Sequence, residues 1–231
     1  MSYPFARRNK GEREINMAGV SVMIGMPAGR DLPIQTVKSL LGTFSACRER
    51  GVPCQFGAIA NSAVIQWARD EVVDLFLKSD ANVLFWIDSD VVWEPGQFIR
   101  FLVWTQLYDV VCGAYPAKVE PPTFYLLGHN GNPNDHGLVD IDGIGLGFVA
   151  MRRSVVEALA DKAPKVRDQI ANRDIAAVFR IDSVRGDRRG EDMAFFADIK
   201  AAGFDVKLDP SISLGHVGQK QYTGSIRDAL K

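Results

Sequence analysis

The sequence predicts one α/β domain with a mostly parallel, Rossmann-like central sheet flanked by helices. Strand-like and helix-like patterns alternate through the first half of the chain, and the run Asn82 to Ile87 is apolar without a break. Such a run is typical of a strand in a parallel sheet that is covered on both faces. The composition of the 231 residues, 47% apolar and 24% charged, is that of an ordinary globular protein. We therefore expect a single domain over residues 1–231.

The first five elements follow from the spacing of apolar residues. Short β-rich apolar runs bounded by turn residues predict strands, and apolar residues recurring every three or four positions predict helices. A glycine after such a helical pattern is a stop signal. The predicted elements are a strand over Val20 to Met26, a helix from Ile34 to about Gly51, a strand over Cys54 to Ile59, a helix over Val64 to Lys78 and a strand over Asn82 to Ile87.

The second half of the chain is less regular. Lys118 to Asp142 contains Pro, Gly, Asn and His with little periodicity, which predicts a long loop or a small hairpin region. Because long loops in compact domains are usually functional, we expect this region near the functional site. The other predicted elements are helices over Pro95 to Gln106, Ser154 to Asp161 and Glu191 to Ala202, and strands over Asp109 to Tyr115, Gly143 to Met151, Ala176 to Ile181 and Phe204 to Leu208.

Charge, cysteine content and hydropathy indicate the setting of the protein. With 27 basic and 28 acidic residues, no overall field attracts the chain to nucleic acid or to an anionic membrane. Three cysteines without a CxxC pair suit a reducing compartment, so we expect a cytoplasmic protein. The apolar runs are far shorter than the about 20 residues of a membrane span, so none is expected. We interpret residues 1–18 as a flexible or peripheral segment.

The strongest chemical signal is the acidic pair in Asp88-Ser89-Asp90, directly after the apolar strand. Side chains two residues apart in an extended segment lie on one face, and open α/β sheets bind ligands at the carboxyl ends of their strands. Two neighbouring carboxylates repel each other unless a cation compensates, and a divalent ion bound to diphosphate oxygens would do so. The alternative is a loop in which both acids cap the helix that begins near Pro95.

Two further motifs follow predicted strands. Gly190-Glu191-Asp192 opens a helix, where acidic residues are favoured by the helix dipole alone. Gly215-His216-Val217-Gly218 follows the last strand, and a histidine there is more often packed or hydrogen-bonded than a ligand. Each motif taken alone favours a structural role, whereas their combination favours a shared site.

The order and spacing of these motifs resemble small single-domain glycosyltransferases of the GT-A fold, of bacterial and phage type. The resemblance covers Val20 to Gly224 and includes Gly143 to Phe148 between the acidic motifs. The "FDS" of that family reads Ile181-Asp182-Ser183 here, with a departure at Ile181, and its "HxGxxxYxG" reads His216 to Gly224. If the chain is encoded by a phage, the cytoplasm in question is that of the host.

The resemblance implies a division of the chain and a set of roles. Residues 19–118 would bind the nucleotide sugar and residues 119–231 the acceptor, with Mn²⁺ or Mg²⁺ as cofactor. Asp90 and His216, with Asp88, would hold the metal, and Asp88 would also reach the ribose or a metal-bound water. Asp192 would be the catalytic base that takes the proton of the acceptor hydroxyl, with Glu191 as the second candidate.

Further residues are expected around the two substrates. The run GIGLG does not fit a dinucleotide fingerprint, because it opens a strand rather than a strand-to-helix turn, so its glycines are taken to allow close approach of a substrate. For the arginines and the lysine, a solvated surface position is the alternative. The predicted nucleotide-sugar residues are Pro27, Ala28, Gly29, Arg30, Arg69, Asp88, Ser89, Asp90, Gly145 and Gly147, and the predicted acceptor residues are Tyr115, Lys118, Asp182, Arg188 and Arg189.

The predicted function is transfer of a hexose or pentose from a nucleoside-diphosphate sugar of UDP or GDP type to an acceptor hydroxyl, with inversion favoured. The acceptor is a glycan, a small molecule or a hydroxylated DNA base, as in phage DNA modification. Alternatives are a nucleotidyltransferase acting on sugar phosphates and a non-catalytic nucleotide-sugar-binding module. Two basic clusters motivate the DNA acceptor, although acidic residues offset both: Arg7, Arg8, Lys10 and Arg13, and Arg180, Arg185, Arg188 and Arg189.

Overall fold

The structure is a computed structural model that describes residues 17–168, 172–184, 187–228 and 230. The expected N-terminal segment, residues 1–18, therefore lies almost entirely outside the described residues. The same is true of the basic residues Arg7, Arg8, Lys10, Arg13 and Arg185. Within the described ranges, no helix combines the length and the hydropathy that crossing a membrane would require.

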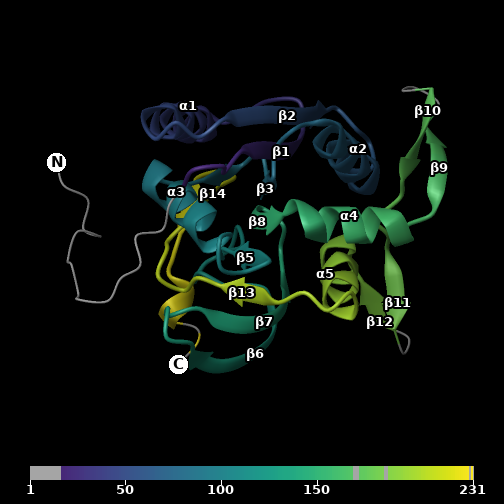
Figure 1. Cartoon of the computed structure of the whole chain (residues 1–231). Helices are drawn as coiled ribbons and strands as arrows, with labels where there is room; N and C mark the ends of the chain where they lie inside the picture. Colours follow the sequence, from purple (N-terminus) through teal and green to yellow (C-terminus); the bar gives the residue numbers. More distant parts are fainter. Residues whose placement is uncertain (1–16, 169–171, 185–186, 229, 231) are drawn as a thin grey trace.

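A mixed sheet of eight strands forms the centre of the described structure (Figure 1). In spatial order its strands are β2 (Cys54–Ala60), β1 (Val22–Ala28), β3 (Val83–Ile87), β8 (Phe148–Arg152), β5 (Val110–Cys112), β13 (Val206–Leu208), β7 (Val139–Ile144) and β6 (Leu126–Pro133). Only β8 and β7 are antiparallel to both of their neighbours. Six of these eight described strands thus run in one direction, and the predicted mostly parallel α/β sheet is confirmed.

Helices cover both faces of this sheet (Figure 1). One face carries α1 (Ile34–Glu49) and α3 (Pro95–Trp104), and the other carries α2 (Ile65–Lys78), α4 (Arg153–Lys162) and α5 (Glu191–Ala201). The central strand β3 shows why its sequence is apolar throughout. Phe85 stacks on Phe98 of α3 with 4.3 Å between ring centroids, while its neighbour Trp86 packs edge-on against Phe179 on the opposite face.

Local sequence signals set the ends of several elements. Helix α3 begins with Pro95 at its first turn and a capping box, in which the backbone N–H of Glu94 donates to the side chain of Gln97 at 2.8 Å. After α1, Gly51 has a φ of +65°, a left-handed conformation that glycine adopts without steric cost. These signals place α1 and α3 as the sequence predicts.

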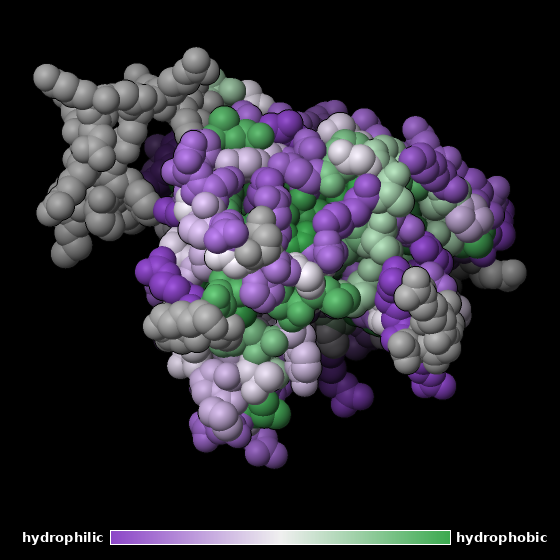
Figure 2. Space-filling view, turned by 90° about the horizontal axis from the view of Figure 1, so that it is seen from below, coloured by the Kyte–Doolittle hydropathy of each residue, from purple (hydrophilic) through white to green (hydrophobic). Residues whose placement is uncertain are grey.

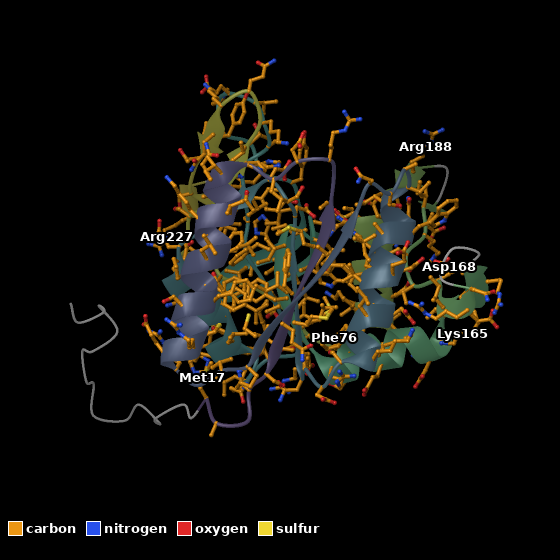
Figure 3. The ribbon with its side chains drawn as sticks, turned by 90° about the horizontal axis from the view of Figure 1, so that it is seen from above. Met17, Phe76, Lys165, Asp168, Arg188 and Arg227 are labelled. Carbon is orange, nitrogen blue, oxygen red and sulfur yellow. The ribbon has the colours of Figure 1, made fainter. Side chains whose placement is uncertain are left out.

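The remaining described elements are short and lie outside the central sheet. Figure 3 shows Lys165 and Asp168 of β9, and Arg188 of β12, on one side of the molecule, with Arg227 on the opposite side. The elements are a hairpin of β9 (Lys165–Asp168) and β10 (Arg173–Ala176), a hairpin of β11 (Asp182–Val184) and β12 (Asp187–Arg189), a sheet of β15 (Gln221–Thr223), β14 (Gly215–Val217) and β4 (Val91–Val92), and a 3₁₀ turn over Ile226–Asp228.

One expectation for the second half is wrong in part, and another is confirmed in one of its two forms. The single strand expected over Gly143 to Met151 is two strands, β7 and β8, separated at Gly145 to Gly147 and not adjacent in the sheet. The stretch Lys118 to Asp142, expected to form a long loop or a small hairpin region, contains β6 and the start of β7, which pair as an antiparallel hairpin. Periodicity left the loop and the hairpin as alternatives because β6 is rich in Gly, Asn and His rather than in β-branched residues.

The strand expected over Ala176 to Ile181 is wrong. Only Ala176 belongs to a strand, and the backbone N–H groups of Val178 and Phe179 bond to a side chain instead of a neighbouring strand. The carboxylate of Asp70, on α2, accepts the backbone N–H groups of Val178 and Phe179 at 2.8 and 3.0 Å. This contact holds Phe179 against the core, where its ring stacks on Phe195 with centroids 4.4 Å apart.

Asp70 is therefore expected to stabilise the fold. Replacing it by Ala would leave two buried backbone N–H groups without an acceptor, at a cost of about 1–3 kcal/mol each or less if water enters. We expect a fall of about 2–4 kcal/mol in the free energy of unfolding, measured by urea denaturation. Asp70→Asn keeps a carbonyl acceptor and should lose clearly less, and equal losses in the two variants would contradict this role.

Candidate active site

The short sheet β15-β14-β4 brings the two distant motifs together. Strand β4 follows the acidic motif directly, and it pairs with β14 so that His216 lies opposite Val91. The backbone N–H of Val217 also donates to the carbonyl of Asp90 at 2.8 Å. As a result, Nε2 of His216 lies 3.3 Å from Oδ1 of Asp90. The convergence predicted for these two side chains is present in the fold.

The orientation of the imidazole is set by the backbone of the segment that follows β5. Nδ1 of His216 lies 2.9 Å from the carbonyl oxygen of Pro116. Because a carbonyl oxygen only accepts, Nδ1 donates in this bond, and Nε2 is the nitrogen that faces Asp90. An imidazole nitrogen fixed in this way beside a carboxylate is a donor pair that fits a divalent cation.

The second carboxylate of the motif faces a different set of partners. Asp88 accepts a hydrogen bond of 3.3 Å from the hydroxyl of Tyr115, and its Oδ1 lies 3.7 Å from a guanidinium nitrogen of Arg69. The described residues contain no group of three or more His, Cys, Asp or Glu side chains arranged to hold a metal ion. In this conformation Asp90 and His216 form a pair that we name the cation corner, and Asp88 belongs to a neighbouring cluster; the binding of a metal ion by these residues stays a prediction.

That neighbouring cluster is built on the buried side chain of Arg69. The guanidinium, which is 4% exposed, forms an ion pair with Asp192 and another with Glu191 at 3.0 Å. Both acids lie in the first turn of α5, which begins at Glu191 as the sequence predicts. Arg69 thus links the two acids of α5 to Asp88, which follows the central strand β3. Its guanidinium carbon also lies over the ring of Phe179, 5.7 Å from the ring centroid.

Burial gives these carboxyl groups different proton affinities. Desolvation raises the pKa of Asp192 to about 6, against the opposing attraction of Arg69, and it also raises the pKa of Asp88. Burial acts on Asp90 in the same direction, but the bonds with His216 and Lys118 outweigh it and lower its pKa to about 2. Asp90 therefore stays a carboxylate at neutral pH, whereas Asp192 titrates about one pH unit below neutral, at its pKa of about 6.

A cavity of about 480 Å³ joins the two groups. Its wall includes His216 from the cation corner, Lys118, which pairs with Asp90, and Asp192 from α5, together with the rings of Tyr115 and Tyr125. The rest of the wall is mainly apolar and consists of Ala117, Val119, Ile144, Gly145 and Met193. A molecule in this cavity would contact a basic and a carboxylate group at once.

The glycines between β7 and β8 make room for Tyr115. A Cβ at Gly147 would lie 2.6 Å from the Tyr115 ring and 2.8 Å from Oδ2 of Asp88, and one at Gly145 would lie 2.5 Å from the Tyr115 hydroxyl. In this structure the close approach that the glycines permit is that of Tyr115. Their predicted contact with a nucleotide sugar stays a prediction.

The other predicted residues are spread around this centre. Pro27 is buried at the end of β1, whereas Gly29 and Arg30 are exposed in the loop that follows. Arg188 is exposed on the hairpin before α5, and Asp182 of the same hairpin lies 3.6 Å from Arg180. The described cavity wall contains Tyr115 and Lys118 of the predicted acceptor set. Contacts of any of these residues with a substrate stay predictions.

Sequence reasoning missed that Arg69 organises the carboxylates. The signal was present, since Arg69 follows the buried Ala68 and lies three and four positions before Val72 and Val73, on the inward face of α2. A basic side chain on such a face requires a buried acidic partner. The strands β4, β14 and β15 were also missed, because two or three residues carry no periodic pattern.

The fold is that of the GT-A glycosyltransferases, as the sequence predicts. A197 from STIV matches 90% of this chain and 91% of its own, with a TM-score of 0.57 and 19% identity. The structure of GalNAc-T7 with UDP, GalNAc and Mn²⁺ matches 86% of this chain and 44% of its own, with a TM-score of 0.55 and 9% identity. No protein-family model and no curated protein matches the sequence.

Proposed function

We propose that this protein is a metal-dependent glycosyltransferase that moves a sugar from a nucleoside-diphosphate sugar to an acceptor hydroxyl, with inversion. The observation that carries the proposal is that one cavity is lined by both Asp192 and His216, whose Nε2 lies 3.3 Å from Asp90. Such a reaction requires a base for the acceptor on one side and charge stabilisation for the leaving diphosphate on the other. The structure of GalNAc-T7 with UDP, GalNAc and Mn²⁺, which shares the fold, supports this chemistry by analogy.

Asp192 is the base in the proposed reaction. The acceptor oxygen forms a bond to the anomeric carbon, the bond from that carbon to the diphosphate oxygen breaks, and the hydroxyl proton passes to the carboxylate. A base whose pKa of about 6 lies just below neutral pH is mostly deprotonated and still a good proton acceptor. Glu191, bound to the same guanidinium, is the second candidate.

Asp90 and His216 would hold the divalent cation, with Asp88 nearby. When bound, a divalent cation supplies charge neutralisation for the departing diphosphate. A pair of one carboxylate and one imidazole suits Mn²⁺ better than Mg²⁺, since Mg²⁺ prefers oxygen ligands throughout. The bond from His216 to Pro116 keeps Nε2 aimed at this corner.

The cavity wall supports an acceptor that presents an apolar or aromatic surface beside its hydroxyl group. Tyr125 is 71% exposed at the wall, so its ring is available to stack on an apolar or aromatic face of an acceptor. A glycan or a small molecule satisfies this requirement. Arg188 and Arg189, which motivate the hydroxylated DNA base as acceptor, are not part of the described cavity wall, so that alternative rests on the sequence.

A thermal-shift screen of nucleoside diphosphates and their sugars, with and without Mn²⁺, tests the proposal. We expect one nucleotide family to raise the Tm only when the metal is present, because the metal would bridge the protein and the diphosphate. Ligand at 100 times its Kd stabilises the folded state by about 2.7 kcal/mol, which sets the expected size of the shift. Asp90→Asn should abolish the metal-dependent part of the shift. Asp174→Asn, which removes an exposed acid on β10, is the matched control and should behave like the unmodified protein.

Three outcomes would contradict the proposal. Stabilisation by nucleotide that is equal with and without Mn²⁺ would argue against the metal role of Asp90. Metal-dependent binding without any transfer or hydrolysis of the sugar would favour the non-catalytic module. Release of inorganic diphosphate from a nucleoside triphosphate and a sugar phosphate would instead identify a nucleotidyltransferase.

A further inference from the structure

The cation corner already contains a positive charge supplied by the chain. Nζ of Lys118 lies 2.5 Å from Oδ2 of Asp90, while His216 faces the other oxygen, Oδ1, at 3.3 Å. Both oxygens of this carboxylate are therefore engaged. In the described part of the chain, Asp90 is the ion-pair partner of Lys118, and the cavity is the space beside it.

The position of Lys118 depends on Gly218, in the turn of the hairpin formed by β14 and β15. A Cβ at Gly218 would lie 3.0 Å from Cδ of Lys118, so the lysine stem crosses the hairpin where the side chain is missing. The backbone beside Lys118 is held by a bond from Ala117 to the carbonyl of Thr123 at 2.7 Å. The aliphatic stem is thus directed toward Asp90. The ammonium group lies at the end of a flexible four-carbon chain and can therefore change its position.

The contact between Lys118 and Asp90 is easily replaced. The Lys118 side chain is 39% exposed and that of Asp90 is 31% exposed, and ion pairs between groups open to water contribute little. A lysine ammonium is a single charge that is strongly hydrated. A divalent cation bound by Asp90 and His216 would carry twice the charge at the same carboxylate.

We propose that Lys118 is an exchangeable counter-ion of Asp90, which occupies the carboxylate until a divalent cation binds and then turns into the cavity to meet the diphosphate. This inference rests on the proposed function, since it concerns the same metal corner. It assigns Lys118 to the leaving group rather than to the acceptor, with which the sequence associates it. Metal binding would thereby free a positive charge at the time when a negatively charged donor has to be bound.

The two roles have opposite signs, which makes them separable by binding measurements alone. Lys118→Met keeps the stem and removes the charge, so Mn²⁺ no longer competes with an ammonium group. We expect Mn²⁺ to bind this variant about two- to fivefold more tightly in the absence of nucleotide, measured by electron paramagnetic resonance of the free ion. With saturating Mn²⁺, inorganic diphosphate should bind the same variant about two- to fivefold more weakly by calorimetry.

Control variants separate this effect from a general change in charge. Lys220→Met removes an exposed lysine of the neighbouring hairpin, which pairs with Glu120, and both affinities should stay at the level of the unmodified protein. Lys118→Arg keeps the positive charge and should keep Mn²⁺ affinity low. An unchanged or weaker Mn²⁺ affinity of Lys118→Met, or an unchanged diphosphate affinity, would overturn the exchange.

The same measurements distinguish failure of this inference from failure of the proposed function. If the unmodified protein binds Mn²⁺ and Asp90→Asn abolishes that binding, the metal site stands whatever Lys118→Met does. If the unmodified protein binds no Mn²⁺ at millimolar concentration, the metal-dependent function is refuted, and the exchange is refuted with it.

Discussion

Replacing Asp192 by Asn is expected to lower kcat by about 10²- to 10⁴-fold, the usual contribution of a general base. The amide keeps the size of the side chain and can still accept a bond from Arg69, but it cannot take the acceptor proton. The affinity for the nucleotide should change little, because the proposed metal ligands Asp90 and His216 keep their mutual contact in this variant. Steady-state kinetics and a binding isotherm for the donor nucleotide measure both quantities.

The pH profile gives an independent readout of the same carboxyl group. The base has to be ionised, and its pKa is raised to about 6, so kcat should fall about tenfold per pH unit below pH 6 and level off above pH 7. Asp198→Asn, in the same helix and paired with Arg180, is the matched control and should keep both rate and profile. A rate of Asp192→Asn within threefold of the unmodified protein would exclude Asp192 as the base.

Removal of Arg69 is expected to have the largest effect on stability. Its guanidinium is nearly inaccessible and faces three carboxylates, so Arg69→Met leaves buried negative charges without compensation, at a cost of about 3–5 kcal/mol. Since Arg69 holds the pKa of Asp192 down, its loss should also raise that pKa and move the acidic limb of the rate profile to higher pH. Urea denaturation and the pH–rate profile measure the two consequences.

A purely structural arginine would produce the first effect without the second. Arg100 offers this comparison, because it forms an ion pair at 2.5 Å with the fully buried Asp209, away from the cavity. Arg100→Met should therefore lower stability and leave the profile in place. Arg69→Lys keeps the charge and serves if the methionine variant does not fold. If the pH–rate profile of Arg69→Lys moved to higher pH as far as that of Arg69→Met, the electrostatic role of Arg69 would be contradicted.

The sequence is informative about the fold wherever a pattern extends over a complete element. Helices α1 to α5 and strands β1 to β3 are long or strongly apolar, and their predicted positions are close to those observed. The acidic residues after β3 and at the start of α5 were located from these elements alone. The first group lies at the carboxyl end of a strand and the second in the first turn of a helix, and in both places the backbone determines the direction of a side chain.

The parts that the sequence did not reveal depend on contacts between distant residues. The segment after Ala176 resembles a strand because it is apolar. Its backbone N–H groups at Val178 and Phe179, however, donate to the carboxylate of Asp70 and not to a neighbouring strand. Tyr115 fills the space over Gly145 and Gly147, which no local pattern encodes. The proximity of His216 to Asp90 was expected from a family resemblance, whereas the two-residue strand that creates it has no signature of its own.

The pairing of β4 with β14 makes the corner of Asp90 and His216 dependent on chain length more than on side-chain identity. The main chain of Val91 faces that of His216, so most substitutions at Val92 or Val217 leave the imidazole in place. One residue inserted between Asp90 and Val91 would move Asp90 one position away from this ladder and turn its carboxylate to the reverse side of the ribbon, away from the imidazole. Tolerance of point changes together with intolerance of one-residue insertions is therefore the mutational pattern to expect in this short segment.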